Sequence, residues 1–136
     1  MGSFSNFLED ALLNHVFEGT EYTQPASTWI ALTTHVLNDA DVGSSLLELD
    51  GGAYARRECK TWSKSSSGDG ATQNGADLTF IQASADWGKI VCFAICDTVT
   101  LNAGNVLAHG VLTISKSVQS GDTPKFAAGD LDVTLD

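Results

Sequence analysis

Cysteine and histidine side chains are the first candidates for chemistry in this sequence. Cys92, Cys96 and His109 could together bind a metal ion, but structural zinc sites place their cysteines on a tight turn. Cys92 and Cys96 instead lie in the apolar run 89–96, which is typical of a strand, and four residues of strand span about 13 Å. That distance excludes a disulfide between them, and Cys59 makes the number of cysteines odd. We therefore predict free thiols, no metal site and folding in a reducing cytoplasm.

Nucleophilic catalysis would need a serine or cysteine, a histidine and an orienting acid. The predicted helix contains His15, a predicted strand ends at His35, and another strand contains His109. The sequence has no Gly-x-Ser-x-Gly motif and no phosphate-binding loop, and the pair Gly51-Gly52 is more typical of a turn. These observations predict that the protein is not an enzyme and uses no cofactor.

Carboxylates cluster in the segment 38–52. Asp39, Asp41, Glu48 and Asp50 could offer oxygen ligands to a hard cation such as calcium, but their spacing matches no complete calcium-binding loop. We interpret the segment as a solvated acidic loop, with a bound cation as the alternative.

The charge of the chain excludes two classes of partner. The 136 residues include 17 Asp and Glu against 7 Lys and Arg, a formal net charge of −10. Nucleic-acid binding requires clustered Lys and Arg, and anionic membrane surfaces also attract basic segments. The pair Arg56-Arg57 is no basic patch, because neighbouring strand residues point to opposite faces, and we expect one of the two to pair with an acid. We predict neither a nucleic-acid nor a membrane partner.

Helical periodicity is strong only in residues 6–17. Apolar residues recur there at helical spacing and cover more than one narrow stripe. Asn6 is the predicted N-cap, Glu9 follows three residues later as in a capping box, and Gly19 is a natural stop.

The rest of the chain has β texture. Strand-like segments lie at 27–34, 53–62, 77–81, 89–96, 106–114, 116–119 and 131–135, and the Ser- and Gly-rich segment 63–75 is a loop or a weakly paired edge. Because no helices alternate with these strands, we predict a mainly β fold. It is an antiparallel β-sandwich of about seven or eight short strands with one N-terminal α-helix. We expect a single domain over 1–136, with a helical arm at 1–19 and the sandwich at 27–136.

Four segments together carry a resemblance to a known family. They are Ser5-Asn-Phe-Leu-Glu-Asp, Gly51-Gly-Ala-Tyr-Ala-Arg-Arg, Trp87-Gly-Lys-Ile-Val-Cys-Phe-Ala-Ile-Cys-Asp and Gly121-Asp-Thr-Pro-Lys-Phe-Ala-Ala-Gly-Asp. Nearly end to end, the chain resembles short virion proteins of tailed bacteriophages, which include capsid cement (decoration) proteins and are often labelled tail fibre proteins. It departs from that pattern at Cys92, at Cys96 and in 63–75.

The resemblance implies a structural role in the virion, for a protein made in the cytoplasm of a host bacterium. Because the chain is short and lacks fibrous repeats, we expect a capsid cement protein that bridges and stabilises major capsid protein subunits. A component of the tail, baseplate or fibre is the alternative. A module that binds host-surface glycans, with Trp62 as its aromatic platform, is a third possibility. We also expect a homo-oligomer, a dimer or a trimer.

Interfaces of this kind use aromatic and aliphatic anchors. On the N-terminal segment the candidates are Phe4, Phe7, Leu8 and Leu12, and elsewhere they are Trp62, Leu131 and Val133. The helix either closes the sandwich or docks on a neighbouring subunit. For Trp29 and Trp87 we expect packing in the core.

Overall fold

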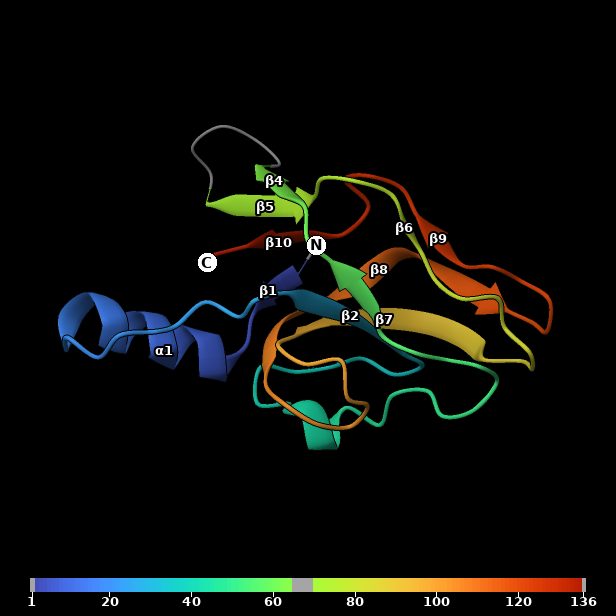
Figure 1. Cartoon of the computed structure of the whole chain (residues 1–136), viewed down its shortest axis with the longest axis horizontal. Coiled ribbons are helices and arrows are strands. Elements are labelled where there is room, and N and C mark those ends of the chain that lie inside the picture. The colour runs from blue at the N-terminus through green and yellow to red at the C-terminus, as the bar shows by residue number, and fades with distance from the viewer. Residues whose placement is uncertain (1, 65–69, 136) are drawn as a thin grey trace.

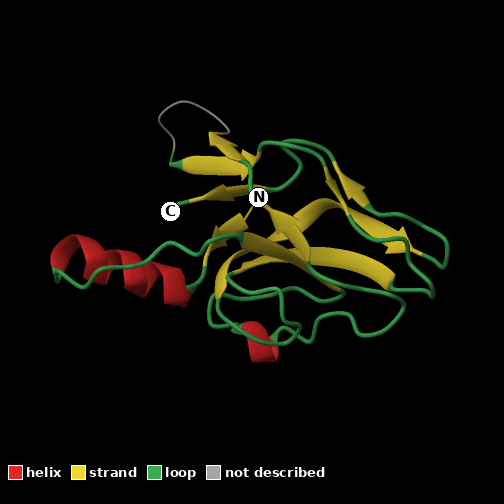
Figure 2. Cartoon of the chain, in the orientation of Figure 1, coloured by secondary structure: helices red, strands yellow, loops and turns green. Residues whose placement is uncertain are grey.

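The computed structural model describes residues 2–64 and 70–135 and contains one α-helix, one short 3-10 helix and ten strands within them (Figures 1 and 2). The helices are α1 (Asn6–Phe17) and η1 (Gly43–Ser45). The strands are β1 (Gly2–Phe4), β2 (Thr28–Thr33), β3 (Arg57–Cys59), β4 (Trp62–Lys64), β5 (Ala71–Asn74), β6 (Leu78–Thr79), β7 (Gly88–Cys96), β8 (Val106–Val118), β9 (Lys125–Phe126) and β10 (Asp132–Thr134). The prediction of a mainly β fold with one N-terminal α-helix is confirmed.

Eight of these strands form one sheet in the order β3-β2-β7-β8-β1-β10-β5-β4, and β6 pairs with β9 in a second, small sheet. All described pairings are antiparallel except that of β1 with β10, so the large sheet is mixed. The sheet curls until its two ends meet. Only Lys60 and Thr61 separate β3 from β4 in the chain, and the Trp62 indole Nε1 donates to Thr28 Oγ1 of β2 at 2.9 Å.

The first described residues belong to the sheet and lead directly into α1. Gly2–Phe4 pairs with β8 on one side and with β10 on the other. A side chain does not fit at Gly2, because its Cβ would lie 2.5 Å from the carbonyl oxygen of His109. The arm therefore starts from a strand that is held on both edges.

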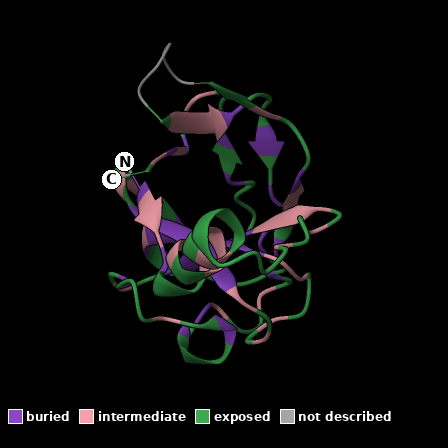
Figure 3. Cartoon of the chain, turned by 90° about the vertical axis from the view of Figure 1, so that its left-hand side faces the viewer, coloured by how far each residue is buried: buried purple, intermediate pink, exposed green. Residues whose placement is uncertain are grey.

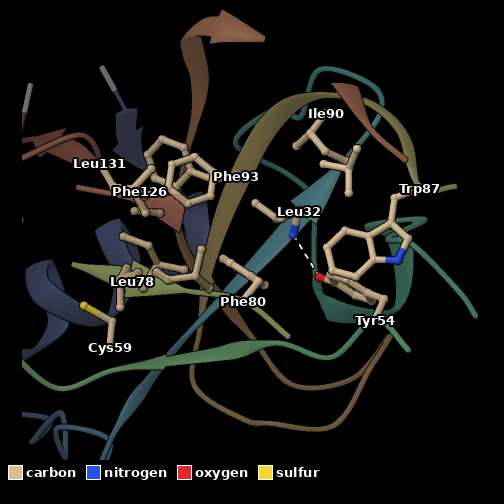
Figure 4. Close-up of a cluster of buried hydrophobic side chains, with 14 of the residues drawn as sticks. Leu32, Tyr54, Cys59, Leu78, Phe80, Trp87, Ile90, Phe93, Phe126 and Leu131 are labelled. Atoms are coloured by element: carbon tan, nitrogen blue, oxygen red, sulfur yellow. Dashed lines mark hydrogen bonds between the residues drawn. The ribbon is translucent and has the colours of Figure 1, made fainter. Parts of the chain in front are cut away.

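The main core lies inside the curled sheet (Figure 4). Its largest buried side chains include Phe93 of β7 and Phe126 of β9, and Leu131 and Val133 are buried there too. At one end of the core, the Tyr54 hydroxyl oxygen accepts a hydrogen bond from the Leu32 amide at 2.9 Å. The main core thus combines residues from many strands.

A second, smaller core lies on the outer face of β2, β7 and β8. Leu37 and Leu46, from the segment that follows β2, cover Cys92 and Cys96 there. The interpretation of 38–52 as a solvated loop is therefore wrong for part of its length, since Leu46 and Glu48 are buried.

Three strand predictions need correction. The segment 53–62 is not one strand: β3 and β4 separate at Lys60, because they pair at opposite ends of the sheet. The segments predicted at 106–114 and 116–119 are one strand, β8, whose four residues 112–115 bulge opposite the single residue Val91. In the Ser-rich segment, β5 is paired on both edges, and residues 65–69 lie outside the described residues.

The helix has the predicted bounds but a different N-cap. Ser5, not Asn6, is the cap: its Oγ accepts from the Leu8 amide at 3.3 Å and also donates to the Val106 carbonyl. Because the cap lies one residue earlier, Glu9 is not at the capping-box position. Buried Ser5 thus fixes the start of α1 against β8.

Candidate interaction surface

The feature that stands out from the body is an arm made of α1 and the segment after it, residues 5–27. Figure 1 shows α1 extending to one side, with the following segment running back beside it. No residue of α1 is buried. Helices of about 12 residues are marginally stable in water unless an apolar face is packed. The arm therefore depends on whatever covers its apolar residues.

The returning segment covers one side of the helix. The rings of Phe7 and Tyr22 meet edge to face with centroids 6.5 Å apart. The Tyr22 amide donates to His15 Nδ1 at 3.2 Å, and the Thr20 amide donates to the Asn14 carbonyl at 3.2 Å. These contacts cover one edge of the Phe7 ring, which stays 36% exposed, and give His15 a structural partner.

The opposite side of the helix, towards its C-terminal end, is uncovered. Leu13, Val16 and Phe17 are 55%, 65% and 79% exposed. Residues three and four positions apart share one face of a helix, so these three side chains form one patch, which we call the arm tip. Figure 3 views the molecule from this end and shows α1 largely exposed.

A small apolar pocket lies at the base of the arm. Its volume is about 220 Å³, and we call it the Trp62 pocket. It is lined by Phe4, Leu8, Trp62, Thr72, Ile95, Leu107, Ala108 and Val133. Trp62 is half-buried, and its hydrogen bond to Thr28 fixes the indole at the pocket wall.

The structure places the seven predicted interface residues in three settings, and Val133 belongs to two of them. Phe4, Leu8, Trp62 and Val133 all line the pocket, so the structure brings four of them together. Leu131 and Val133 are 0% and 2% exposed, which makes them core residues with almost no surface of their own. Leu12 is half-buried on the helix, and Phe7 packs on Tyr22.

The arm tip was not among the predicted interface residues. The signal for it is the excess of apolar positions in 6–17, because one core-facing stripe would not need Leu13 and Phe17. Of the other tryptophans, Trp87 is buried as expected, whereas Trp29 is only half-buried.

Charge is distributed unevenly between the arm and the pocket. The arm contains Glu9, Asp10, Glu18 and Glu21 and no Lys or Arg. Residues 56–64, which run through β3 and β4, contain four of the seven basic residues: Arg56, Arg57, Lys60 and Lys64. Lys64 is exposed and shares a strand face with Trp62, because the two are separated by two positions. Because Arg56 is buried beside Glu48 and Lys60 pairs with Glu58, the basic group that lies near the pocket is Lys64.

Arg56 is the member of the arginine pair that binds an acid. Its side chain and that of Glu48 are both 0% exposed, with Arg56 Nη2 2.5 Å from Glu48 Oε2. Glu48 also accepts from the Tyr54 hydroxyl at 3.1 Å and from the Asn102 amide at 3.1 Å. Burial alone would lower the pKa of Arg56, but the hydrogen bond and charge of Glu48 raise it above its usual value. This ion pair is structural.

The residues considered for metal binding or catalysis are placed in other contacts. His109 Nε2 lies 2.9 Å from Asp39 Oδ1. The Cys92 thiol donates to the Gly110 carbonyl at 2.9 Å, and all three cysteines are free and buried. Within residues 2–64 and 70–135, no group of three or more His, Cys, Asp or Glu side chains is arranged to hold a metal ion. In the same part of the chain, no helix is long and apolar enough to cross a membrane.

Comparison with known proteins identifies the family. No curated protein matches the chain. The family described as podophage GP4 fiber I protein gp80 matches residues 3–134, which include every described strand except the first residue of β1. This match covers the arm, the Trp62 pocket and both cores. The chain therefore belongs to the phage fibre protein family described as podophage GP4 fiber I protein gp80.

Proposed function

We propose that this protein is a structural, non-catalytic subunit of the fibre apparatus of a tailed bacteriophage. The observation that carries the proposal is the family match over residues 3–134. The described surface supports a role in assembly, because its distinctive features are an uncovered apolar arm tip and a small apolar pocket. Exposed apolar patches of this kind are typical of protein–protein contact sites.

The family description supports a fibre rather than the capsid cement that chain length favoured. A cement protein would bind the major capsid protein, whereas a fibre subunit would bind other tail components and further copies of itself. The absence of fibrous repeats does not conflict with a fibre role, because a compact domain with a projecting arm can join neighbouring subunits. We therefore propose a location in the tail for this chain.

Copy number tests this placement. We would quantify the protein in purified virions by mass spectrometry, relative to the major capsid protein, and locate it by immunogold labelling. A fibre subunit is expected at a few to some tens of copies, with label at the tail. Hundreds of copies distributed over the shell would contradict the proposal and restore the cement function.

A further inference from the structure

We propose that two copies of this chain bind each other through their arms, so that the arm tip of each copy packs into the Trp62 pocket of the other. This contact would supply a partner for the proposed fibre subunit, but the proposal of the contact does not depend on the fibre function. Self-association is measured on the purified chain, whereas placement in the fibre is measured on virions.

The arm tip requires a partner outside its own chain. Leu13, Val16 and Phe17 occupy one face of α1, and the returning segment packs on the opposite side through Tyr22. Of the twelve exposed large hydrophobic residues within 2–64 and 70–135, four lie on this 12-residue helix. Anchors at i, i+3 and i+4 are the pattern by which a helix docks in an apolar groove.

The Trp62 pocket has the size and polarity for such an anchor. Ligand pockets for small molecules usually enclose about 300–1,000 Å³. The Trp62 pocket is smaller, about 220 Å³, and seven of its eight lining residues are apolar. It therefore suits one apolar side chain, such as that of Val16, better than a small molecule.

The positions of tip and pocket make the contact reciprocal. Phe4 and Leu8, which line the pocket, lie at the base of α1, and Phe17 ends it. From Leu8 to Phe17 the helix rises by about 14 Å. Leu8, Leu12 and Val16 are spaced by four residues and share one side of α1, whereas Phe17 points away from Leu8. When two such helices lie side by side in opposite directions, Val16 of each copy therefore reaches the base of the other, and Leu12 faces the seam at mid-length. One two-fold axis then satisfies both contacts.

Charge favours a second copy as the occupant of the pocket. The arm carries four acids and no Lys or Arg, while Lys64 lies beside Trp62 on the same strand face. In the paired arrangement, Glu18 and Glu21 next to the tip approach Lys64 of the other copy. A chain with a net charge of −10 otherwise repels its own copies, so this complementarity selects the arm-to-pocket orientation.

Sedimentation equilibrium on the full chain tests the contact. We expect the wild-type chain to form a dimer, and Val16→Ser to raise its dissociation constant by about tenfold or more, as for other interface anchors. Val36→Ser is the matched control, because Val36 is 62% exposed, close to the 65% of Val16, but lies outside the arm and the pocket. Lys64→Glu is expected to weaken the dimer, and Lys89→Glu, at another exposed lysine, is not. A monomeric wild type, or equal effects of Val16→Ser and Val36→Ser, would overturn the proposal.

Cross-linking distinguishes this contact from other ways in which arms could pair. Glu18→Cys and Lys64→Cys place exposed thiols next to the tip and on the same strand face as Trp62, while the native cysteines are buried. A short bis-maleimide should join the two variants to each other when they are mixed, more efficiently than it joins either variant to itself. Preferential Glu18→Cys self-linkage would mean that tips meet tips, which contradicts the proposal.

Discussion

At the scale of single residues, the buried pair of Glu48 and Arg56 is the most consequential contact. Arg56 Nη1 also donates to the carbonyls of Thr98 and Ala103, at 2.8 and 3.2 Å. One arginine therefore connects the segment after η1 with the turn between β7 and β8. Because both charges are removed from water, each depends on the other for compensation.

Removing Arg56 from that pair should lower the free energy of unfolding much more than removing the neighbouring exposed Arg57. We expect Arg56→Met to lower the free energy of unfolding by about 3–5 kcal/mol, because Glu48 is left as an uncompensated buried charge. Arg57→Met, at an exposed position, should change it by about 0.5 kcal/mol or less. Urea denaturation measures both. Similar small losses would mean that water reaches Glu48 in solution.

The buried thiols predict a loss of stability at alkaline pH. Burial raises the pKa of Cys96 to about 12 from an ordinary value of 9.0, and it also raises the pKa of Cys59 and Cys92. Above pH 9 the unfolded chain loses these protons while the folded chain retains them. The stabilising contribution is therefore complete below pH 9 and is lost as the pH rises towards 12.

The measurement is the free energy of unfolding between pH 8 and pH 11. Each fully coupled thiol should contribute a slope of up to about 1.4 kcal/mol per pH unit. Cys96→Ala should flatten the profile, and Ellman's reagent should find three reactive thiols only after unfolding. Rapid reaction of a thiol in the folded chain at pH 8 would contradict the burial on which this prediction rests.

At the scale of elements, the start of α1 can be assigned by mutation. We expect Ser5→Ala to lower the free energy of unfolding by about 1 kcal/mol or more, as for other N-caps, because Ser5 caps the helix and also bonds to β8. Asn6→Ala should have little effect, since Asn6 is exposed and is not the cap. Thermal unfolding of the two variants gives the comparison. A larger loss for Asn6→Ala would restore the cap expected from the sequence.

The elements also show how far the sequence alone could lead. The helix 6–17 and the strand 89–96 have strong local periodicity, and both are found nearly where they were predicted. The break between β3 and β4 depends on partners far away in the chain, β2 for one and β5 for the other, so local pattern cannot reveal it. The Trp62 pocket has the same origin, because its lining comes from six strands and the helix, apart in sequence. Helical periodicity indicated surplus apolar positions on the arm, but not which of them the returning segment would cover.

At the scale of the whole molecule, the curled sheet consists of two halves that β1 holds together. Strands β3, β2, β7 and β8 form one half, and β10, β5 and β4 form the other. At the far ends of the sheet, the indole of Trp62 meets Thr28. Because β1 also leads directly into α1, force on the arm would act on the seam between the halves. A fibre subunit with this topology would couple its contacts with neighbours to its own stability.

This topology predicts that loss of β1 separates the halves before it unfolds them. In a chain that begins at Ser5, β10 loses β1 as its partner, whereas β7 and β8 keep their mutual pairing. Hydrogen exchange should therefore speed up first in β10 and in its neighbour β5. Gly2→Val should act in the same direction, since a Cβ at Gly2 would meet the His109 carbonyl oxygen at 2.5 Å, whereas Ser3→Ala serves as the control. Equal acceleration in all strands would mean that the sheet unfolds as one unit. In that case the contact between Trp62 and Thr28, together with the core, would hold the sheet closed without β1.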